Sequence, residues 1–348
     1  MIFGKAIDVA ILENLKKSKK FLLMGLGVSY DNKQFYSKFP KQVIETPVSE
    51  LAFSGMAVGL GTQKYFPMVD HGRVEFSILA FDQIFTQAAR WEYMFGGNYP
   101  CTPCFKICIG RQWGNGPQHT GTYHSIFMQS LGLDIFIPST PYEAYLHIKN
   151  ILKLKNPAVI LEHRWLYLND QNFNLNSTKK IHRALVEKDG NENLIVTYGD
   201  GFSESLKAKK ILNSLNIRVS VMSISYFPNK NRLSKSIKNE IKKYKNVYYV
   251  DTSPFEFGIL NGISGILNSQ NKLKKINENI ISCPRTPCPT SPKLAEKYYP
   301  TKNEIVKKIF KKSKSTRRIK LEKIDFYEIH TVTKTNLNEL MTNNYYIY

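Results

Sequence analysis

The sequence predicts an α/β protein made of two consecutive, mostly parallel sheet domains. Short apolar runs bounded by Gly, Pro or Lys alternate with longer segments whose apolar residues recur at helical spacing. Strands that alternate with helices in this way are typical of parallel sheets. A segment rich in Asn, Lys and Ser at 163–185 divides the alternation into two blocks. The predicted domains are 1–170 and 191–312, with a linker at 171–190 and a basic tail at 313–348.

The first block begins with a helix at 4–17 and a buried strand at 21–30 that runs into a Gly-containing turn. After a short polar segment, a strand–helix–strand pattern occupies 42–70. A Gly-rich loop at 110–124 interrupts the elements that follow, and ordered loops of this kind often hold functional residues. These further elements alternate between helix and strand, at 75–95, 103–109, 124–130, 133–137, 141–153 and 157–161.

The second block repeats the alternation. Its predicted strands are at 194–199, 217–224, 246–253 and 278–284. Predicted helices occupy 201–215, a stretch from about residue 257, and 304–312. The tail contains a run of charges and ends in a Tyr- and Asn-rich stretch. Its composition leaves two alternatives open, disorder and folding onto a partner.

The composition limits the classes of function. The chain has 348 residues, of which 42% are hydrophobic, so two domains with real cores are expected. It contains no apolar run of about 18 residues and no uninterrupted apolar stretch at its start, which predicts a cytoplasmic protein without a membrane span. The net charge of +21 is scattered and accompanies no nucleic-acid motif, so nucleic-acid binding is not expected. An acidic protein partner is compatible with this charge.

The five cysteines, an odd number without a secretion signal, predict reduced thiols. Cys101 and Cys104 have the spacing of half a zinc site. The only candidates for a second ligand pair are Cys283 and Cys288, far along the chain and spaced differently. We therefore expect Cys101 and Cys104 to flank and enter the buried strand at 103–109, and we predict no metal site.

The most informative stretch is 45–82. Thr46 before Pro47 suits a helix start, and Glu50 then falls in the first turn, where the helix dipole favours a negative charge. Five small residues follow on this helix and would let a backbone or a flat ligand come close, namely Ser54, Gly55, Ala57, Gly59 and Gly61. From these residues alone, Glu50 is also explained as an ordinary first-turn charge, with the small residues only permitting tight packing.

The order and spacing of several motifs resemble the β subunit of thiamine-diphosphate-dependent 2-oxo acid dehydrogenase E1 enzymes, such as the pyruvate, branched-chain and acetoin enzymes. The resemblance extends, with decreasing strength, to about residue 312. It rests on TPVSE at 46–50, FS-x2-AFDQ at 76–83, GG at 96–97, WGNGPQHT at 113–120, LGLDIFIPSTPYEA at 131–144 and NPAVILEHRWLY at 156–167.

This resemblance implies a transketolase-like pyrimidine-binding domain, a transketolase C-terminal domain, and thiamine diphosphate held between an α and a β subunit. Glu50 matches the family glutamate that hydrogen-bonds N1′ of the aminopyrimidine ring. Phe76 matches the aromatic residue that packs on that ring, and Gly72 is placed among the cofactor-binding residues. His119 matches the histidine that faces the substrate and the acyl group. A core position for Phe76 and a structural loop role for His119 are the simpler alternatives.

Some positions depart from the family pattern. Leu26 and Gly27 replace two acidic residues, and Leu154 replaces an Asp of a monovalent-cation site, so bound potassium is not predicted. Gln129 stands where many relatives have a second histidine, and His124 has no family counterpart. Gly199-Asp200-Gly201 is treated as a chance match to the GDG…NN diphosphate motif, because the asparagines are missing. Mg²⁺ and its ligands are therefore expected from the α subunit.

The resemblance thus implies an enzyme, the β subunit of an α2β2 E1. It would decarboxylate a 2-oxo acid and pass the acyl unit to a lipoyl carrier on an E2 protein. The departures leave two alternatives. One is a divergent transketolase-like carboligase with a separate α chain, and the other is a non-catalytic paralogue that keeps the fold.

Overall fold

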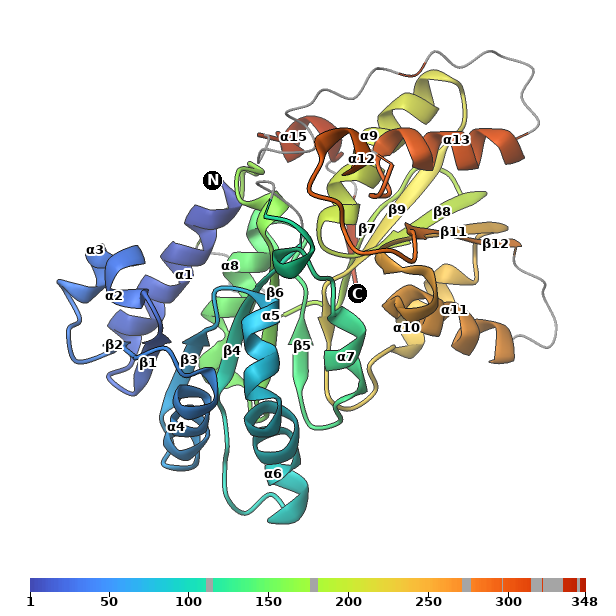
Figure 1. The fold of residues 1–348 in the computed structure, drawn as a ribbon. Coiled ribbons are helices and arrows are strands. Elements are labelled where there is room, and N and C mark those ends of the chain that lie inside the picture. The colour runs from blue at the N-terminus through green and yellow to red at the C-terminus, as the bar shows by residue number, and fades with distance from the viewer. Residues whose placement is uncertain are drawn as a thin grey trace.

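The computed structural model describes residues 1–110, 115–175, 181–270, 277–295, 297–313, 321, 334–342 and 345–348. It contains two sheets, one of seven and one of six strands, with helices on their faces (Figure 1). The α/β class with two consecutive, mostly parallel sheets is therefore confirmed.

In the first sheet the strand order is β10-β5-β6-β4-β3-β1-β2. Six of these strands come from the first block, and all of their pairings are parallel. Their bounds are β1 Phe21–Gly25, β2 Val43–Glu45, β3 Phe66–Asp70, β4 Cys104–Ile109, β5 Asp134–Phe136 and β6 Ala158–His163. The seventh, β10 (Tyr226–Phe227), is supplied by the second block and runs antiparallel to β5, so the chain joins its two halves through this sheet.

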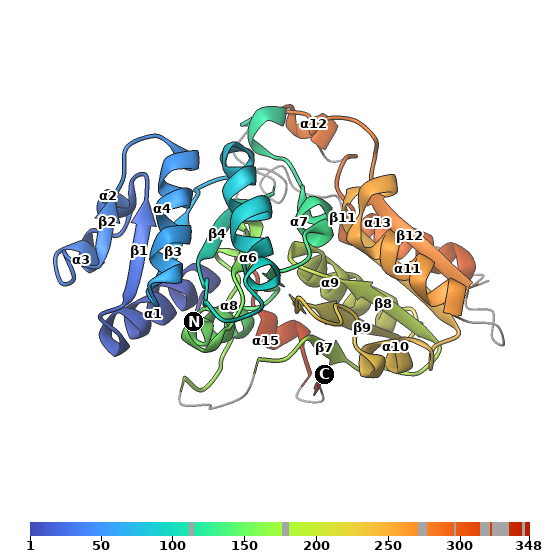
Figure 2. The same ribbon diagram turned by 90° about the horizontal axis from the view of Figure 1, so that it is seen from below.

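Helices cover both faces of the first sheet (Figure 2). Helices α1 (Phe3–Lys17) and α8 (Pro141–Lys149) pack together on one face. On the other face lie α4 (Glu50–Thr62) and the segment that ends in α6 (Ala89–Met94). Short helices complete this half of the molecule, namely α2 Val28–Asp31, α3 Lys33–Tyr36, α5 Val74–Ser77 and α7 His124–Gln129.

The second sheet has the order β12-β11-β8-β9-β7-β13. Strands β8, β9, β11 and β12 are parallel, whereas β7 and β13 pair antiparallel at one edge. The strands are β7 Ala184–Glu187, β8 Asn193–Thr197, β9 Val219–Ile224, β11 Asn246–Pro254, β12 Asn277–Cys283 and β13 Tyr345–Ile347. The helices are α9 Asp200–Ser214, α10 Lys235–Ile241, α11 Ile259–Gln270, α12 Pro292–Ala295 and α13 Lys302–Lys312. One hydrophobic cluster is continuous between the two sheets, so the halves are packed against each other.

Three predicted elements differ in detail. Strand β1 ends at Gly25 rather than near residue 30, because Gly27 has a positive φ of 77° and starts α2. The single helix expected at 75–95 is divided into short α-helical, 3₁₀-helical and π-helical turns. Apolar periodicity does not distinguish these turn types, since all of them bury one face.

The expected linker at 171–190 contains strand β7, which the sequence analysis did not predict. The strand has only four residues and no flanking turn glycine before it, so periodicity gave little signal. The end of the tail is also ordered, since α15 (Leu337–Leu340) and β13 pack on the second domain. The charged run at 313–323 lies almost wholly outside the described residues. Within the described parts of the chain, no helix is both long and apolar enough to span a bilayer.

Candidate functional site

The carboxyl ends of the parallel strands meet at one edge of the first sheet. Strands β3, β4 and β6 end there at Asp70, Ile109 and His163, and α4 starts there at Glu50 after β2. In open α/β sheets, ligands bind outside the carboxyl ends of the strands. The residues predicted from the sequence therefore lie at the edge where a site is expected.

Glu50 lies in the first turn of α4 and is buried, with 8% of its surface exposed. One turn later, Ser54 contacts the Nε2 atom of His71 at 3.2 Å. Since His71 precedes Gly72, this contact brings the start of α4 to the end of β3. Burial lowers the pKa of His71 to about 4, so this imidazole is neutral at physiological pH.

Phe76 and His119 are in direct contact. Their ring centroids are 5.7 Å apart in an edge-on arrangement. His119 ends a short 3₁₀ turn, and its backbone carbonyl accepts a hydrogen bond from Arg73 at 3.4 Å. The carboxylate of Glu75 accepts a bond from the Gly121 N–H at 2.6 Å. The structure therefore brings these two predicted site residues together, and the polar residues around Phe76 hold the loop of His119.

One ring nitrogen and one aromatic face at this edge are not fully covered by the described residues. The Nδ1 atom of His119 is buried and has no hydrogen-bond partner among the described residues. The ring of Phe76 remains 37% exposed. Gly72 has a φ of 65°, and a Cβ there would have no described atom within 4 Å. An exposed aromatic face beside open space and an unpaired ring nitrogen is suited to a flat heteroaromatic ligand.

A buried ion triad lies behind this edge. Lys106 on β4 contacts Asp70 at 2.9 Å and Glu162 on β6 at 2.8 Å. Burial alone would raise the pKa of Asp70, but the charge and hydrogen bond of Lys106 hold it below its usual value. The triad borders a cavity of about 300 Å³ between α1 and the strand ends. Because each charge is paired, the triad fixes the relative positions of β3, β4 and β6.

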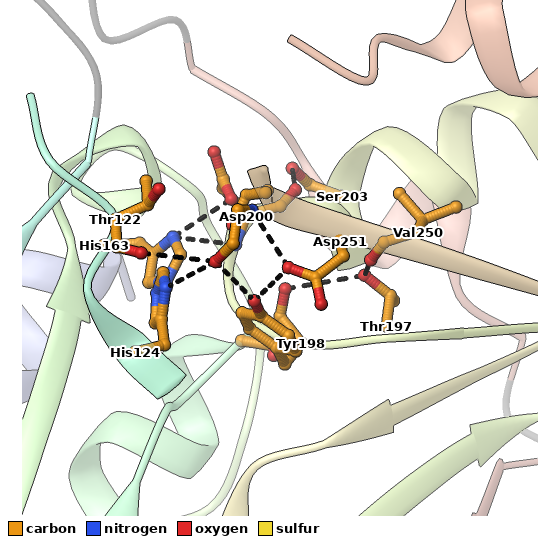
Figure 3. Close-up of polar contacts among 12 residues, drawn as sticks. Thr122, His124, His163, Thr197, Tyr198, Asp200, Ser203, Val250 and Asp251 are labelled. Atoms are coloured by element: carbon orange, nitrogen blue, oxygen red, sulfur yellow. Dashed lines mark hydrogen bonds and ion pairs between the residues drawn. The ribbon is translucent and has the colours of Figure 1, made fainter. Parts of the chain in front are cut away.

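A second polar cluster was not predicted from the sequence. The Nε2 atoms of His124 and His163 are 2.8 Å apart, and Nδ1 of His163 lies 3.0 Å from Oδ1 of Asp200 (Figure 3). All three side chains are buried. Asp200 begins α9 in the second domain, whereas both histidines belong to the first. This cluster therefore crosses the boundary between the two sheets.

The cluster continues into the second domain. Ser253 lies 3.4 Å from Nδ1 of His124, and its backbone N–H donates to Asp251 at 2.9 Å. Tyr198 hydrogen-bonds the same carboxylate (Figure 3). Asp251 also accepts the backbone N–H of Leu260 at 2.9 Å, so it caps the start of α11. These bonds attach the histidine pair to the framework of the second sheet.

The sequence contained little signal for this cluster. His163 falls in the recognised EH pair at the end of β6, but no spacing rule links it to His124 or Asp200. Asp200 belongs to the Gly-Asp-Gly triplet that was treated as a chance match to a diphosphate motif. In the structure, this aspartate binds His163 instead. Only the three-dimensional fold brings these residues together.

The cysteines behave as structural residues. All five are buried, and none of them forms a disulfide. Burial raises the pKa of Cys101 to about 12, which disfavours the thiolate that a metal would need. Within the described ranges, no group of three or more His, Cys, Asp or Glu side chains is arranged to hold a metal ion.

The residues at the carboxyl edge fit one half of thiamine diphosphate. The aminopyrimidine needs a carboxylate and an apolar or aromatic face, which Glu50 and Phe76 have the chemistry to provide. Hydrophobic side chains around them are also solvent-exposed, namely Val48, Leu51, Met56, Ile78 and Leu79. An exposed apolar patch of this kind marks a surface that another protein covers.

Comparisons with known proteins agree with the two-domain reading. The family described as "Transketolase, pyrimidine binding domain" matches residues 3–169, and "Transketolase, C-terminal domain" matches residues 182–305. A solved structure entitled "Split gene transketolase, inactive beta4 tetramer" superposes with a TM-score of 0.73. It shares 18% identity and covers 88% of this chain and 96% of its own, so it supports the fold.

The curated relatives identify the family more narrowly than the two domain matches do. The acetoin:2,6-dichlorophenolindophenol oxidoreductase subunit beta of Cupriavidus necator is 26% identical, over 80% of this chain and 82% of its own. The pyruvate dehydrogenase E1 component subunit beta of Chaetosphaeridium globosum is 31% identical, over 61% and 68%. The mitochondrial pyruvate dehydrogenase E1 subunit beta of Saccharomyces cerevisiae is 27% identical, over 74% of each chain. The chain belongs to the family of β subunits of thiamine-diphosphate-dependent 2-oxo acid dehydrogenase E1 enzymes.

Proposed function

We propose that this chain, as the β half of an E1 enzyme, supports decarboxylation of a 2-oxo acid and transfer of the acyl unit to a lipoyl group on an E2 protein. The observation that most supports this proposal is the Phe76–His119 contact at 5.7 Å, at the strand edge where α4 begins with Glu50. The assembly would be α2β2, with the diphosphate and Mg²⁺ held by the α chain.

Each residue has a role that its surroundings allow. Glu50, in the first turn of α4, would hold or release a proton at N1′ of the aminopyrimidine, and Phe76 would pack on that ring. His119 would hydrogen-bond the substrate carbonyl or the developing acyl group through its unpaired nitrogen. When bound, thiamine diphosphate supplies the nucleophilic carbon and the electron sink of the reaction. The exposed apolar residues beside Glu50 would be covered by the α chain, which excludes water from the reacting groups.

The decisive experiment is Glu50→Gln in the chain reconstituted with its α partner. Since the amide keeps the shape but cannot exchange the proton, we expect 2-oxo acid decarboxylation to fall by about two or more orders of magnitude. Size-exclusion chromatography should show unchanged assembly. Decarboxylation is followed with pyruvate, branched-chain oxo acids and an artificial electron acceptor.

The same assay separates the alternatives. Unchanged turnover in Glu50→Gln would contradict the assigned role of this carboxylate. Activity that needs an aldehyde acceptor, with none towards a lipoyl domain, would indicate a transketolase-like carboligase. Complete absence of turnover in the wild-type complex, with thiamine diphosphate bound, would indicate a non-catalytic paralogue. A cytoplasmic location remains a prediction from the sequence.

A further inference from the structure

His124 and His163 lie in the first domain and contact each other. Each of them also contacts a residue of the second domain. Asp200 contacts His163 at 3.0 Å, the two rings meet at 2.8 Å, and Ser253 contacts His124 at 3.4 Å. Asp200 is 3% exposed, His163 1%, and the other two are fully buried. Water does not compete for these bonds, so each proton in the chain must have a defined place.

The carboxylate determines where the protons lie. Only one hydrogen fits between two Nε2 atoms at 2.8 Å. An ionised Asp200 accepts but does not donate, so His163 must hold a proton on Nδ1 and accept on Nε2. His124 then donates from Nε2 and accepts the Ser253 hydroxyl proton on Nδ1. The backbone N–H of Asp200 also lies within hydrogen-bond reach of Nδ1 of His163, at a longer 3.3 Å, and would donate to it only in the opposite tautomer.

The packing around His163 is specific to this arrangement. Gly199 has a φ of 54°, and a Cβ at that position would lie 2.5 Å from Nε2 of His163. The imidazole therefore occupies the space that any other side chain at position 199 would fill. Burial, together with the neighbouring His163, holds the pKa of His124 well below its usual range. His124 is thus kept uncharged, with its one proton on a single ring nitrogen.

His124 begins α7, directly after the loop that contains His119. The same single Ser253 hydroxyl proton is shared with the backbone carbonyl of Thr122 in this loop, 3.2 Å from the hydroxyl oxygen. From the first domain, Glu75 accepts the N–H of Gly121. The loop is therefore held from both domains, and the contribution of the second domain is made through His124 and Ser253.

We propose that Asp200 is a positioning residue, which acts through His163 and His124 to seat the His119 loop against the second domain. The expected effect on catalysis rests on the proposed function, since it requires His119 to act on the substrate. The expected tautomers and the position of the loop do not rest on it, because they concern this chain alone. The two parts can therefore be tested separately.

The first test uses the wild-type chain labelled with ¹⁵N-histidine, with signals assigned through His119→Asn and His163→Asn variants. Two-bond ¹H–¹⁵N couplings report which ring nitrogen holds the proton. We expect Nδ1–H on His163 and Nε2–H on His124 at pH 7. Finding Nδ1 of His163 without a proton would overturn the proposal, because Asp200 would then not determine which ring nitrogens hold the protons.

The second test compares Asp200→Asn with Asp189→Asn, a substitution in the same domain. The side-chain partners of Asp189 are Asn213, Arg218 and Lys209, all within the second domain. An amide at 200 can donate to Nδ1, so we expect both tautomers to reverse and the His119 signals to shift. With the α partner and pyruvate, we expect kcat to fall by about a hundredfold, with an altered pH profile. Asp189→Asn should keep the wild-type tautomers and rate.

Gly199→Ala displaces His163 without changing a charge and should also shift the His119 signals. If Asp200→Asn does not fold, Gly199→Ala is measured in its place. Wild-type tautomers and unshifted His119 signals in both variants would overturn the proposal. An inactive wild-type complex would count against the proposed function only, since the tautomer and His119 measurements need no turnover.

Discussion

At the scale of single residues, the triad of Asp70, Lys106 and Glu162 joins three strand ends through buried charge. The side chain of Lys106 is 10% exposed and that of Glu162 is 2% exposed, so neither ion pair is strongly screened by water. Removing the one cation would leave two carboxylates buried and close together. The triad therefore makes a testable contribution to stability at the edge that supports Glu50 and His119.

We predict that Lys106→Met lowers the free energy of unfolding by about 3–5 kcal/mol, because it leaves buried carboxylates unpaired. The measurement is urea denaturation at pH 7. The control is Lys149→Met, which removes a half-exposed pair with Glu13 at 3.3 Å and should change stability by about 1 kcal/mol or less. Equal effects of both substitutions would contradict the assigned importance of the triad.

Lys106→Met should also reverse the way in which the free energy of unfolding depends on pH. In the wild type the pKa of Asp70 is held below 3.8, so its contribution is present above that pH and is lost as the pH falls through the folded pKa. Without Lys106, burial would raise this pKa instead. The folded variant would then favour the protonated acid, and its stability should fall as the pH rises from about 4 towards 7.

The sequence predicts single residues well where a local motif surrounds them. Glu50 and His119 were both named from the motifs around them. The Thr46-Pro47 helix start was wrong, however, because α4 begins at Glu50 with Ser49 as its N-cap. His163 and Asp200 could not be paired in this way. They are separated along the chain, lie in different domains, and meet only because β6 and α9 are packed together.

At the scale of elements, the end of the chain holds the two domains together. Strand β13 forms one edge of the second sheet and pairs with β7. The backbone of Asp170, at the end of the first domain, bonds Thr335 and Leu337 at 2.8 Å each. The side chain of Asp170 also binds the N-terminal ammonium of Met1 at 2.7 Å. Residues 334–342 and 345–348 belong to this segment, and its strand covers an edge that would otherwise offer free backbone groups.

We predict that deleting residues 345–348 exposes β7. Hydrogen exchange should accelerate by about tenfold or more at those amides of Ala184–Glu187 that face β13, because they lose their partner strand, whereas the alternate amides still face β9. Tyr348→Phe, which removes only the phenol bond to Glu240 at 2.6 Å, serves as the control and should leave β7 protected. Unchanged exchange in the deletion variant would show that β13 does not protect the edge.

The elements that the sequence predicted are those with strong periodicity. Helix α1 and strands β4 and β9 were placed to within about two residues. The short strands β7, β10 and β13 were missed, because two to four residues are too few to show an alternation. They form by adding to an edge that already exists, so tertiary pairing rather than local preference decides them.

At the scale of the whole molecule, an apolar face lies beside the candidate site. Leu51 and Leu79 are 54% and 62% exposed, on α4 and just after α5. Relatives of this chain are named as β subunits, and a monomer gains nothing from exposing leucines around a buried glutamate. This face is therefore the surface on which we expect the α chain to complete the site.

We predict that Leu79→Asp prevents co-purification with the α chain and abolishes thiamine-diphosphate-dependent decarboxylation. A charge buried at an interface is unpaired, which weakens binding by about 2 kcal/mol or more. The melting temperature of the isolated chain should not change, because residue 79 makes few contacts within it. Ile266→Asp is the matched control, since Ile266 is 45% exposed on α11 in the second domain. If Ile266→Asp disrupted assembly and Leu79→Asp did not, the α chain would dock on the second domain, and Glu50 would not lie at the interface between the subunits.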